Sequence, residues 1–225
     1  CDSVSCMLAG AEKLIGALGS AVDPKAVRVV RAPCIGRCAG APAARIGDRE
    51  VDHATAAKLQ EMARNGQTDV VVPEHVELAA YLADGGYETL RKVRSGEIGL
   101  DAIMEKMQGA GLRGLGGAGF PIGRKWSSIR DAESERTYAV CNAAEGEPGT
   151  FKDRAVLRAN PFWVLEGLLV AAHAVRAEEA YVALKASFAT ERQPLADLGV
   201  LAIAKWATGG RSTAVLPSRL YRPAV

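Results

Sequence analysis

The sequence lacks any apolar stretch long enough to cross a membrane. A membrane-spanning helix needs about 18 or more consecutive apolar residues, and the longest apolar run, Phe162–Val175, is interrupted by Glu166, Gly167 and His173. We therefore expect no membrane span and interpret this run as a buried helix. The chain also lacks the basic and apolar regions of a signal peptide. It starts at Cys1 rather than Met, so we expect the natural N-terminus to lie upstream.

The chain has little net charge and few cysteines. A formal net charge of +2 does not indicate a nucleic-acid-binding protein. The length of 225 residues suffices for one large domain or two small ones. Without an export signal we expect a reducing, cytoplasmic location, where clustered cysteines bind metal more often than they form disulfides.

Four of the five cysteines form two pairs, Cys1-x4-Cys6 and Cys34-x3-Cys38. Between the pairs we predict a helix over Met7–Leu18 and a short strand over Val27–Val30, which brings both pairs to the same end of a small α/β unit. Four thiolates at one place suit zinc or an iron–sulfur cluster. The long x4 loop favours a [2Fe–2S] cluster, because two irons need ligands spread more widely than one ion does; zinc or disulfides are the alternatives.

The residues that follow complete this unit. We predict a hairpin whose strands Ala43–Ile46 and Arg49–Val51 flank a turn. A helix over Ala54–Arg64, capped by Asp52 and ended by Asn65–Gly66, comes next.

The cysteine spacing around a helix and a strand resembles the thioredoxin-like [2Fe–2S] ferredoxin, the small partner of the NADH-binding subunit in complex I and related diaphorases. The resemblance implies that Cys1, Cys6, Cys34 and Cys38 bind the cluster. The 27 residues between the pairs make this chain more similar to versions fused in front of a flavin-binding chain. Cys141 has no part in that scheme and is interpreted as a buried thiol in an apolar strand.

The stretch Gly109–Trp126 holds seven glycines in its first fifteen residues and continues into Arg124–Lys125. Glycine lets backbone N–H groups approach a ligand closely, and a concave run of N–H groups binds phosphate. The buried-type residues in the stretch favour a loop for a phosphate-bearing cofactor over a flexible linker. We predict a helix over Leu100–Met107 just before it, so the loop fits neither the Rossmann nor the P-loop pattern, both of which need a preceding strand.

A second polar group follows a predicted strand, Thr137–Asn142. The strand leads into a turn with an amide and two carboxylates, Asn142, Glu145 and Glu147. Open α/β sheets bind ligands at the carboxyl ends of their strands. The alternative is a simple N-cap, with Thr150 capping a helix that starts at Phe151; both roles are compatible.

The two motifs GLRGLGGAGFPIGRKW and CNAAEGEPGTFKDR together resemble one family, the flavin- and NADH-binding subunit shared by complex I, NAD-reducing hydrogenases and NAD-dependent formate dehydrogenases. With the ferredoxin-like segment in front, the chain is most similar to the beta subunit of molybdenum- or tungsten-containing formate dehydrogenase. The cofactors implied are FMN, NAD and a [2Fe–2S] cluster. The implied FMN- and NAD-binding residues are Gly114, Gly116, Gly117, Ala118, Gly119, Phe120, Gly123, Lys125, Asn142, Glu145 and Glu147.

Within that set the resemblance implies separate roles. Lys125 lies near the FMN phosphate, and Asn142 and Glu145 contact the flavin. Phe120 and Glu147 hold the nicotinamide side of NADH, and we predict these two as the catalytic residues. The implied partners are NADH or NAD⁺ and a catalytic subunit with molybdenum or tungsten, or other iron–sulfur subunits.

The expected fold class is α/β: a thioredoxin-like [2Fe–2S] domain over residues 1–66, a linker with short helices over 67–98 and the N-terminal part of an FMN/NADH-binding domain over 99–188. Residues 189–225 are expected to form a divergent, poorly ordered tail, and the family's C-terminal half to be missing. The family has Asp where this chain has Ala144, so we expect altered FMN affinity or redox tuning.

Overall fold

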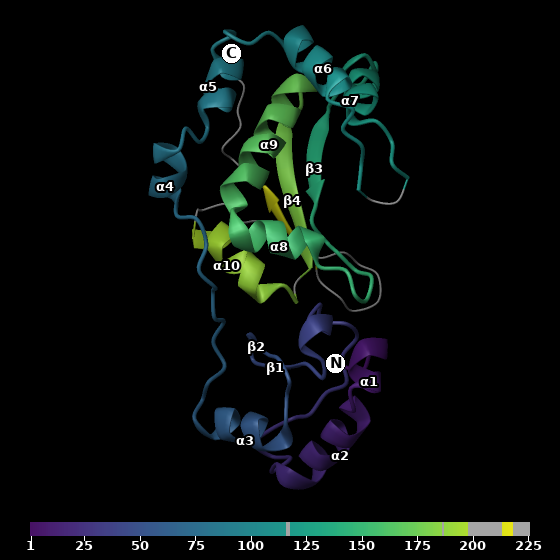
Figure 1. Ribbon diagram of the computed structural model, residues 1–225, viewed down its shortest axis with the longest axis vertical. Helices are drawn as coiled ribbons and strands as arrows, with labels where there is room; N and C mark the ends of the chain where they lie inside the picture. Colours follow the sequence, from purple (N-terminus) through teal and green to yellow (C-terminus); the bar gives the residue numbers. More distant parts are fainter. Residues whose placement is uncertain (116–117, 186, 198–212, 218–225) are drawn as a thin grey trace.

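The computed structural model describes residues 1–115, 118–185, 187–197 and 213–217. Figure 1 shows two lobes in an elongated molecule: an N-terminal lobe of residues 1–66, and a larger C-terminal lobe that begins at residue 78. An extended connector, residues 67–77, runs along one side of the molecule between them.

The described residues form helices and strands in the following order. The N-terminal lobe contains α1 Val4–Leu8, α2 Ala11–Ala21, the 3-10 turn η1 Cys38–Gly40, β1 Ala44–Ile46, β2 Arg49–Val51 and α3 Ala56–Arg64. The C-terminal lobe contains α4 Leu78–Ala83, α5 Glu88–Arg94, α6 Leu100–Gly109, α7 Ile122–Arg130, β3 Tyr138–Asn142, α8 Lys152–Ala159, α9 Pro161–Ala174, β4 Glu179–Lys185, α10 Ala189–Asp197 and β5 Thr213–Pro217.

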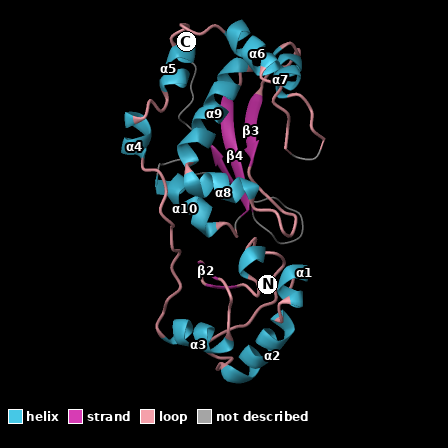
Figure 2. Cartoon of the chain, viewed as in Figure 1, coloured by secondary structure: helices cyan, strands magenta, loops and turns pink. Residues whose placement is uncertain are grey.

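The N-terminal lobe is built on the antiparallel hairpin β1–β2, which confirms the predicted hairpin. The rest of this lobe consists of helices and loops (Figure 2). Gly47 takes a positive φ of 57° at the turn, a conformation that glycine adopts without strain. Leu18 of α2 and Leu59 of α3 pack together with Val51 of β2 in one buried cluster.

Two local predictions in this lobe are wrong. Val27–Val30 is not a strand, because in the described part of the lobe the only hairpin is β1–β2 and Val30 stays 60% exposed. The helix predicted over Met7–Leu18 is broken at Gly10, whose φ of 92° ends α1 and starts α2 in a new direction.

The cap of α3 also differs from the prediction. Thr55, rather than Asp52, accepts the N–H of Lys58 at 3.2 Å and so caps the helix. Asp52 is instead bound to Arg37 across the lobe. Asn65 ends the helix as predicted.

The C-terminal lobe is organised by a three-stranded sheet in the order β3–β4–β5. β3 and β4 are parallel, with Cys141 opposite Val182, and β5 pairs antiparallel with β4. Parallel neighbours require a long crossover, which α8 and α9 provide. The predicted strand at Thr137–Asn142 is confirmed as β3.

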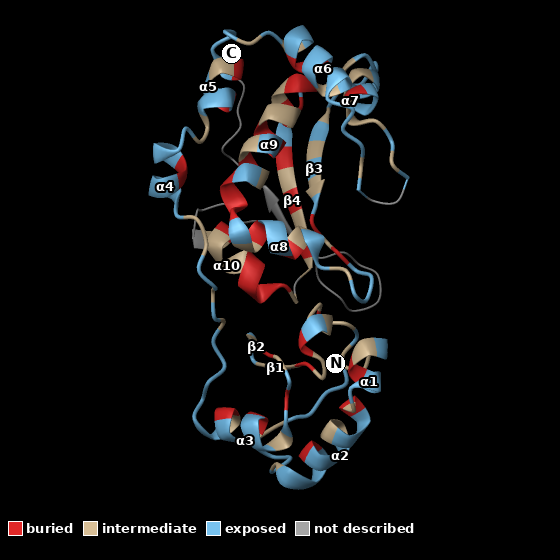
Figure 3. Cartoon of the chain, in the orientation of Figure 1, coloured by how far each residue is buried: buried red, intermediate tan, exposed pale blue. Residues whose placement is uncertain are grey.

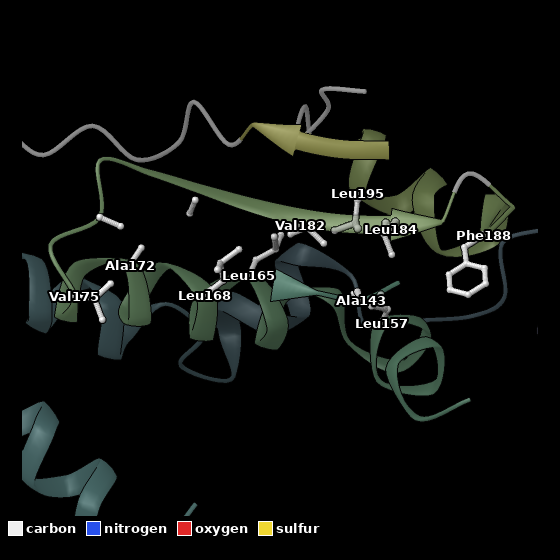
Figure 4. Packing of buried hydrophobic residues seen from close by; sticks show 12 residues of the cluster. Ala143, Leu157, Leu165, Leu168, Ala172, Val175, Val182, Leu184, Phe188 and Leu195 are labelled. Atoms are coloured by element: carbon white, nitrogen blue, oxygen red, sulfur yellow. The ribbon is translucent and has the colours of Figure 1, made fainter. Parts of the chain in front are cut away.

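The main core lies between α9 and this sheet. Alternate residues of β4, Ala180, Val182 and Leu184, are buried in this core. Figure 4 shows Val182 and Leu184 on the same core as Leu165 and Leu168 of α9. The apolar run therefore forms a buried helix, as predicted. Figure 3 shows the buried residues following α9 and β4, with the outer faces of α4 to α7 exposed.

Asn160 and Pro161 start α9 at a defined position. The Asn160 Oδ1 accepts the N–H groups of Phe162 at 3.1 Å and Trp163 at 3.2 Å, which satisfies two free donors of the first turn. Proline at the first helical position has no N–H to satisfy.

The connecting helices α4 and α5 dock on α9 through one carboxylate. Glu166 of α9 accepts the Tyr81 hydroxyl, the Tyr87 N–H at 2.9 Å and the Leu90 N–H at 3.2 Å. Tyr87 is the N-cap residue of α5 but offers no side-chain cap, so Glu166 caps α5 from a distant part of the chain.

No single helix in the described part of the chain is long and apolar enough to cross a membrane; α8 and α9 meet the length and composition criteria only as a pair bent by 104°. Residues 189–197, assigned by sequence to a poorly ordered tail, form α10. This helix buries Leu195 completely against the main core. The rest of that tail, apart from β5, lies outside the described residues.

We expect Glu166→Ala to release α4 and α5 from α9. The change leaves the N–H groups of Tyr87 and Leu90 without an acceptor, which costs about 1–3 kcal/mol. Amide hydrogen exchange should accelerate at these two positions. Glu105→Ala, at an exposed position of α6, should leave amide exchange unchanged at both Tyr87 and Leu90. Unchanged exchange in Glu166→Ala would contradict this account of how α4 and α5 dock on α9.

Candidate functional site

The two cysteine pairs come together, as the sequence predicts. Cys6 is buried in a cluster with Ile35, which lies between Cys34 and Cys38, and Cys1 packs against the same cluster. The Cys34 and Cys38 Sγ atoms lie 3.4 Å apart. All four thiols are free, so the structure does not contain the disulfides considered from sequence.

Backbone N–H groups point at three of the four sulfurs. Gly36 donates to Cys34 Sγ at 3.3 Å, Ala43 to Cys6 Sγ at 3.4 Å and Gly149 to Cys38 Sγ at 3.2 Å. Donors of this kind stabilise negative sulfur. Burial raises the pKa of the Cys34 thiol. Burial also acts to raise the pKa of Cys38, but the Gly149 N–H and neighbouring donors outweigh it, so that pKa lies below its ordinary value.

This donor set fits an iron–sulfur cluster. A [2Fe–2S] cluster is ligated by thiolates that accept backbone N–H groups. Cys1, Cys6, Cys34 and Cys38 are the residues that would hold it.

The glycine-rich loop joins α6 to α7. Gly114 N–H donates to the Phe120 carbonyl at 2.9 Å, and the Arg113 side chain reaches the Gly119 carbonyl at 2.9 Å. Ala118 and Phe120 are exposed at the tip. A Cβ at Gly119 would meet open space, but its φ of 58° favours glycine. Gly116 and Gly117 lie outside the described residues.

The loop ends in a helix that sequence reasoning missed. α7 begins at Ile122 without any side-chain cap and without an acidic residue in its first turn, which contains Lys125. A helix N-terminus with free N–H groups and a nearby lysine favours a phosphate. Gly123 has a packing role as well, because a Cβ there would lie 2.8 Å from the Gln108 backbone N in α6. The loop and α7 therefore fit the phosphate of FMN.

The absence of a strand before the loop is confirmed, since α6 occupies Leu100–Gly109. The signal for α7 was present in the amphipathic spacing of Ile122, Trp126 and Ile129, which the preceding Pro121 obscured. Proline is here the N-cap residue and not a helix breaker.

The turn after β3 carries the remaining predicted residues. Asn142 and Glu147 are exposed at its start and tip. Asn142 Oδ1 accepts the Ala144 N–H at 3.2 Å. Thr150 does not cap α8, because its hydroxyl donates back to the Glu147 carbonyl at 2.6 Å. The predicted flavin and NADH contacts of these residues stay predictions.

Glu145 differs from its neighbours because it is buried. Its side chain is 2% exposed and pairs with the equally buried Arg154 of α8, with Arg154 Nε 3.4 Å from Glu145 Oε2. Lys152 lies 3.7 Å from the same carboxylate. Its predicted contact with the flavin stays a prediction; the structure shows a carboxylate that fixes the turn between β3 and α8.

Arg154 also reaches the other lobe. Its Nη1 donates to the Gly36 carbonyl in the cysteine loop, and its guanidinium lies 4.7 Å from the Phe188 ring centroid. A Cβ on Gly36 would collide with the Arg154 guanidinium, and Gly36 has a φ of 81°. Glycine at position 36 is therefore required for this contact.

A second arginine of α8 extends the contact between lobes. Arg158 binds Glu191 of α10 with Nε 2.6 Å from Oε1, and Glu50 of β2 at 3.2 Å. Burial, reinforced by the Glu191 charge, raises the pKa of Glu50. A cavity of about 170 Å³ between Cys38, Asp52, Thr150 and Arg158 lies beside this network.

Sequence reasoning missed the roles of Arg154 and Arg158. They stand four residues apart and so share a face of α8, but that spacing gives no indication of a partner more than a hundred residues away. Cys141, predicted as a buried thiol in an apolar strand, lies in β3 but is only half-buried, packed against the main core. Partial burial raises the pKa of its thiol.

Comparison with known proteins agrees with the division of the chain into two lobes. Residues 107–198 match the family described as the Nuo51 FMN-binding domain, and residues 1–67 match the thioredoxin-like [2Fe–2S] ferredoxin. Residues 107–198 are thus similar to the Nuo51 FMN-binding domain, and residues 1–67 of the same polypeptide are similar to a thioredoxin-like [2Fe–2S] ferredoxin domain.

Individual relatives are similar over part of their length. A subunit of the NADH-quinone oxidoreductase of Rhizobium meliloti is 48% identical over 122 residues, 54% of this chain and 29% of the relative. The alpha subunit of the NAD-reducing hydrogenase HoxS of Cupriavidus necator is 47% identical over 88 residues, 39% of this chain and 15% of the relative. The chain thus spans less than a third of these relatives' length.

A solved structure covers both lobes. An NAD⁺-reducing [NiFe]-hydrogenase in the air-oxidized state superimposes with a TM-score of 0.69 and 30% identity, covering 87% of this chain and 38% of that one. The fold class predicted from sequence, a thioredoxin-like [2Fe–2S] domain followed by part of an FMN-binding domain, is confirmed.

We expect Gly36→Ala to separate the lobes. The added Cβ collides with Arg154 and strains a left-handed residue. Small-angle scattering should show a larger radius of gyration, and limited proteolysis should cut residues 67–77 faster. Gly19→Ala, in the exposed helix α2, should leave both unchanged. A compact Gly36→Ala variant would show that Gly36 is not needed for docking.

Proposed function

We propose that this chain is the FMN- and NADH-binding diaphorase subunit of an NAD-dependent formate dehydrogenase, an NAD-linked oxidoreductase. The observation that carries the diaphorase assignment is the direct contact between the turn after β3 and the cysteine loop, where Gly149 donates to Cys38 and Arg154 to Gly36. A flavin half and a cluster half that touch in this way suit electron exchange between the two. The formate assignment rests on the fused order of the two segments and on the Arg-Gly-Leu-Gly-Gly loop motif, Arg113–Gly117.

When bound, FMN supplies hydride exchange with NADH, and the [2Fe–2S] cluster supplies one-electron storage. The protein provides placement and charge. The α7 N-terminus and Lys125 neutralise the phosphate; Asn142 orients the flavin from the carboxyl end of β3. Phe120, 49% exposed and 5.9 Å from the Arg124 guanidinium, offers an apolar face for nicotinamide, and the exposed Glu147 is the polar partner for that group.

We propose the corresponding domain division as 1–66 for the cluster, 67–98 for the linker and 99–188 for FMN and NADH. The family match over 1–67 supports the end of the first domain. The match over 107–198 and the helix α10 both continue past residue 188, so we propose that the third domain extends to Asp197. Ala144 lies between Asn142 and Glu145 on the turn, and we propose that its lack of a carboxylate alters FMN affinity or potential.

Lys125→Ala tests the phosphate site. Loss of one charge-assisted contact is worth about 1.5–3 kcal/mol, so the dissociation constant for FMN should rise about tenfold or more. The measurement is quenching of FMN fluorescence on titration with flavin-depleted protein. Lys106→Ala, an exposed lysine of α6, is the matched control; equal affinities in both variants would remove Lys125 from the site.

The diaphorase itself has a direct test. Denatured protein should release FMN, and the intact chain should reduce ferricyanide with NADH. If iron and sulfide are present but FMN and this activity are not, the chain is instead a non-catalytic [2Fe–2S] electron carrier.

The electron donor is tested on the complex that copurifies with the tagged chain. Formate-dependent reduction of NAD⁺, together with molybdenum or tungsten by elemental analysis, is the expected result. Hydrogen-dependent reduction would assign the chain to a hydrogenase, and NADH-dependent quinone reduction to a complex I-like enzyme. Either of these outcomes would overturn the formate assignment while leaving the diaphorase assignment in place.

A further inference from the structure

Arg154 is the one cationic side chain of the C-terminal lobe that the structure, within its described residues, shows bonded to the cysteine loop of the N-terminal lobe. It is 3% exposed, and it lies on α8, a helix whose preceding turn holds the predicted flavin contacts. It is also absent from the set of cofactor-binding residues predicted from sequence. Its position thus calls for a separate explanation.

Three fixed contacts hold the guanidinium in place. Nη1 donates to the Gly36 carbonyl, Nη2 to the Thr150 carbonyl and Nε to Glu145 Oε2. The Phe188 ring, itself fully buried, covers one face at 4.7 Å. Because Arg154 is only 3% exposed, solvent screens its charge much less than that of a surface arginine.

The charge lies next to the sulfurs that would hold the cluster. Gly36 is two residues from both Cys34 and Cys38, and Gly36 and Gly149 donate to these two sulfurs. Arg154 also helps to fix the second donor, because it holds the Thr150 carbonyl, one residue after Gly149. A single side chain therefore contributes a positive charge and orients a hydrogen-bond donor at the cluster.

We infer that Arg154 is a positioning residue that raises the reduction potential of the [2Fe–2S] cluster from the flavin-binding lobe, so that the potential depends on docking of the two lobes. This inference rests on the proposed cluster. Reduction adds one electron, and with it one negative charge, to the cluster and its thiolates. A nearby fixed cation and N–H groups aimed at the sulfurs stabilise that added charge, and both are known determinants of cluster potential.

The test is a redox titration of the cluster-loaded full chain, with dithionite as reductant and the electron paramagnetic resonance signal of the reduced cluster as readout. In Arg154→Gln the oxidised-to-reduced ratio at a fixed ambient potential should rise about tenfold, which for one electron is a midpoint lower by about 59 mV. Arg154→Lys, which retains the charge, should shift less than half as far.

Lys152→Gln is the matched control. Lys152 belongs to the same helix and also lies near Glu145, but its side chain is 49% exposed, so solvent screens its charge. The midpoint potential of the cluster in Lys152→Gln should stay at the wild-type value. If Arg154→Gln also stays there, or if the two variants shift equally, the inference is wrong.

Two further outcomes keep the test decisive. Arg154→Gln leaves the buried Glu145 without a counter-ion, so if it does not fold, the double variant Glu145→Gln/Arg154→Gln is used. A smaller shift in the same direction is expected, because the guanidinium contacts the cysteine loop directly, whereas the Glu145 carboxylate binds its Nε. If wild-type protein contains no iron or acid-labile sulfide, the proposed cluster fails first. A loaded cluster with an unchanged midpoint in the folded variant overturns only the role of Arg154.

Discussion

The ion pair between Glu145 and Arg154 is the constraint on which the arrangement of the two lobes depends. A carboxylate that is 2% exposed requires a counter-ion, since an unpaired buried charge is very costly. The pair fixes the path of the chain between β3 and α8, and that path presents the Gly149 N–H to Cys38. A requirement of local electrostatics in one lobe thus determines the surroundings of the sulfurs in the other.

The core between α9 and the sheet provides the rigid support for this pair. β4 is buried on the face that meets α9, and α8 and α9 meet at the Asn160 cap, so the direction of α8 follows from the packing of α9. α5 is attached to the same helix through Glu166. Most of the described C-terminal lobe is therefore positioned by a single apolar helix.

The sequence contained enough information for most elements and for the cysteine site. The hairpin at Gly47, the buried helix α9 and the strand β3 follow from turn chemistry and periodicity, which are local. The failed prediction at Val27–Val30 has a nonlocal cause, because an alternating pattern forms a strand only where a partner exists. The break at Gly10 and the start of α7 after Pro121 could not be predicted in the same way. Each depends on a backbone conformation at one residue that the residue type allows but does not require.

Polar contacts between residues far apart in the chain could not be predicted from a single sequence. Arg154 is the last residue of the motif CNAAEGEPGTFKDR, yet its partner Gly36 lies 118 positions away. Gly36 contributes to the cysteine site through its N–H group, which donates to Cys34 Sγ. Gly36 has a second role, because its missing side chain leaves space for Arg154 of the other lobe. This role can be recognised only when the two lobes are placed together.

The connector over residues 67–77 changes how strong the contact between the lobes needs to be. Two separate proteins must bury a substantial interface to remain bound, whereas tethered domains meet at an effective concentration in the millimolar range for short linkers. Val76 N–H bonds to the Ala159 carbonyl at 3.1 Å, which shortens the free span further. The polar contacts of Arg154 and Arg158 with the N-terminal lobe are then sufficient to keep the cysteine loop beside α8.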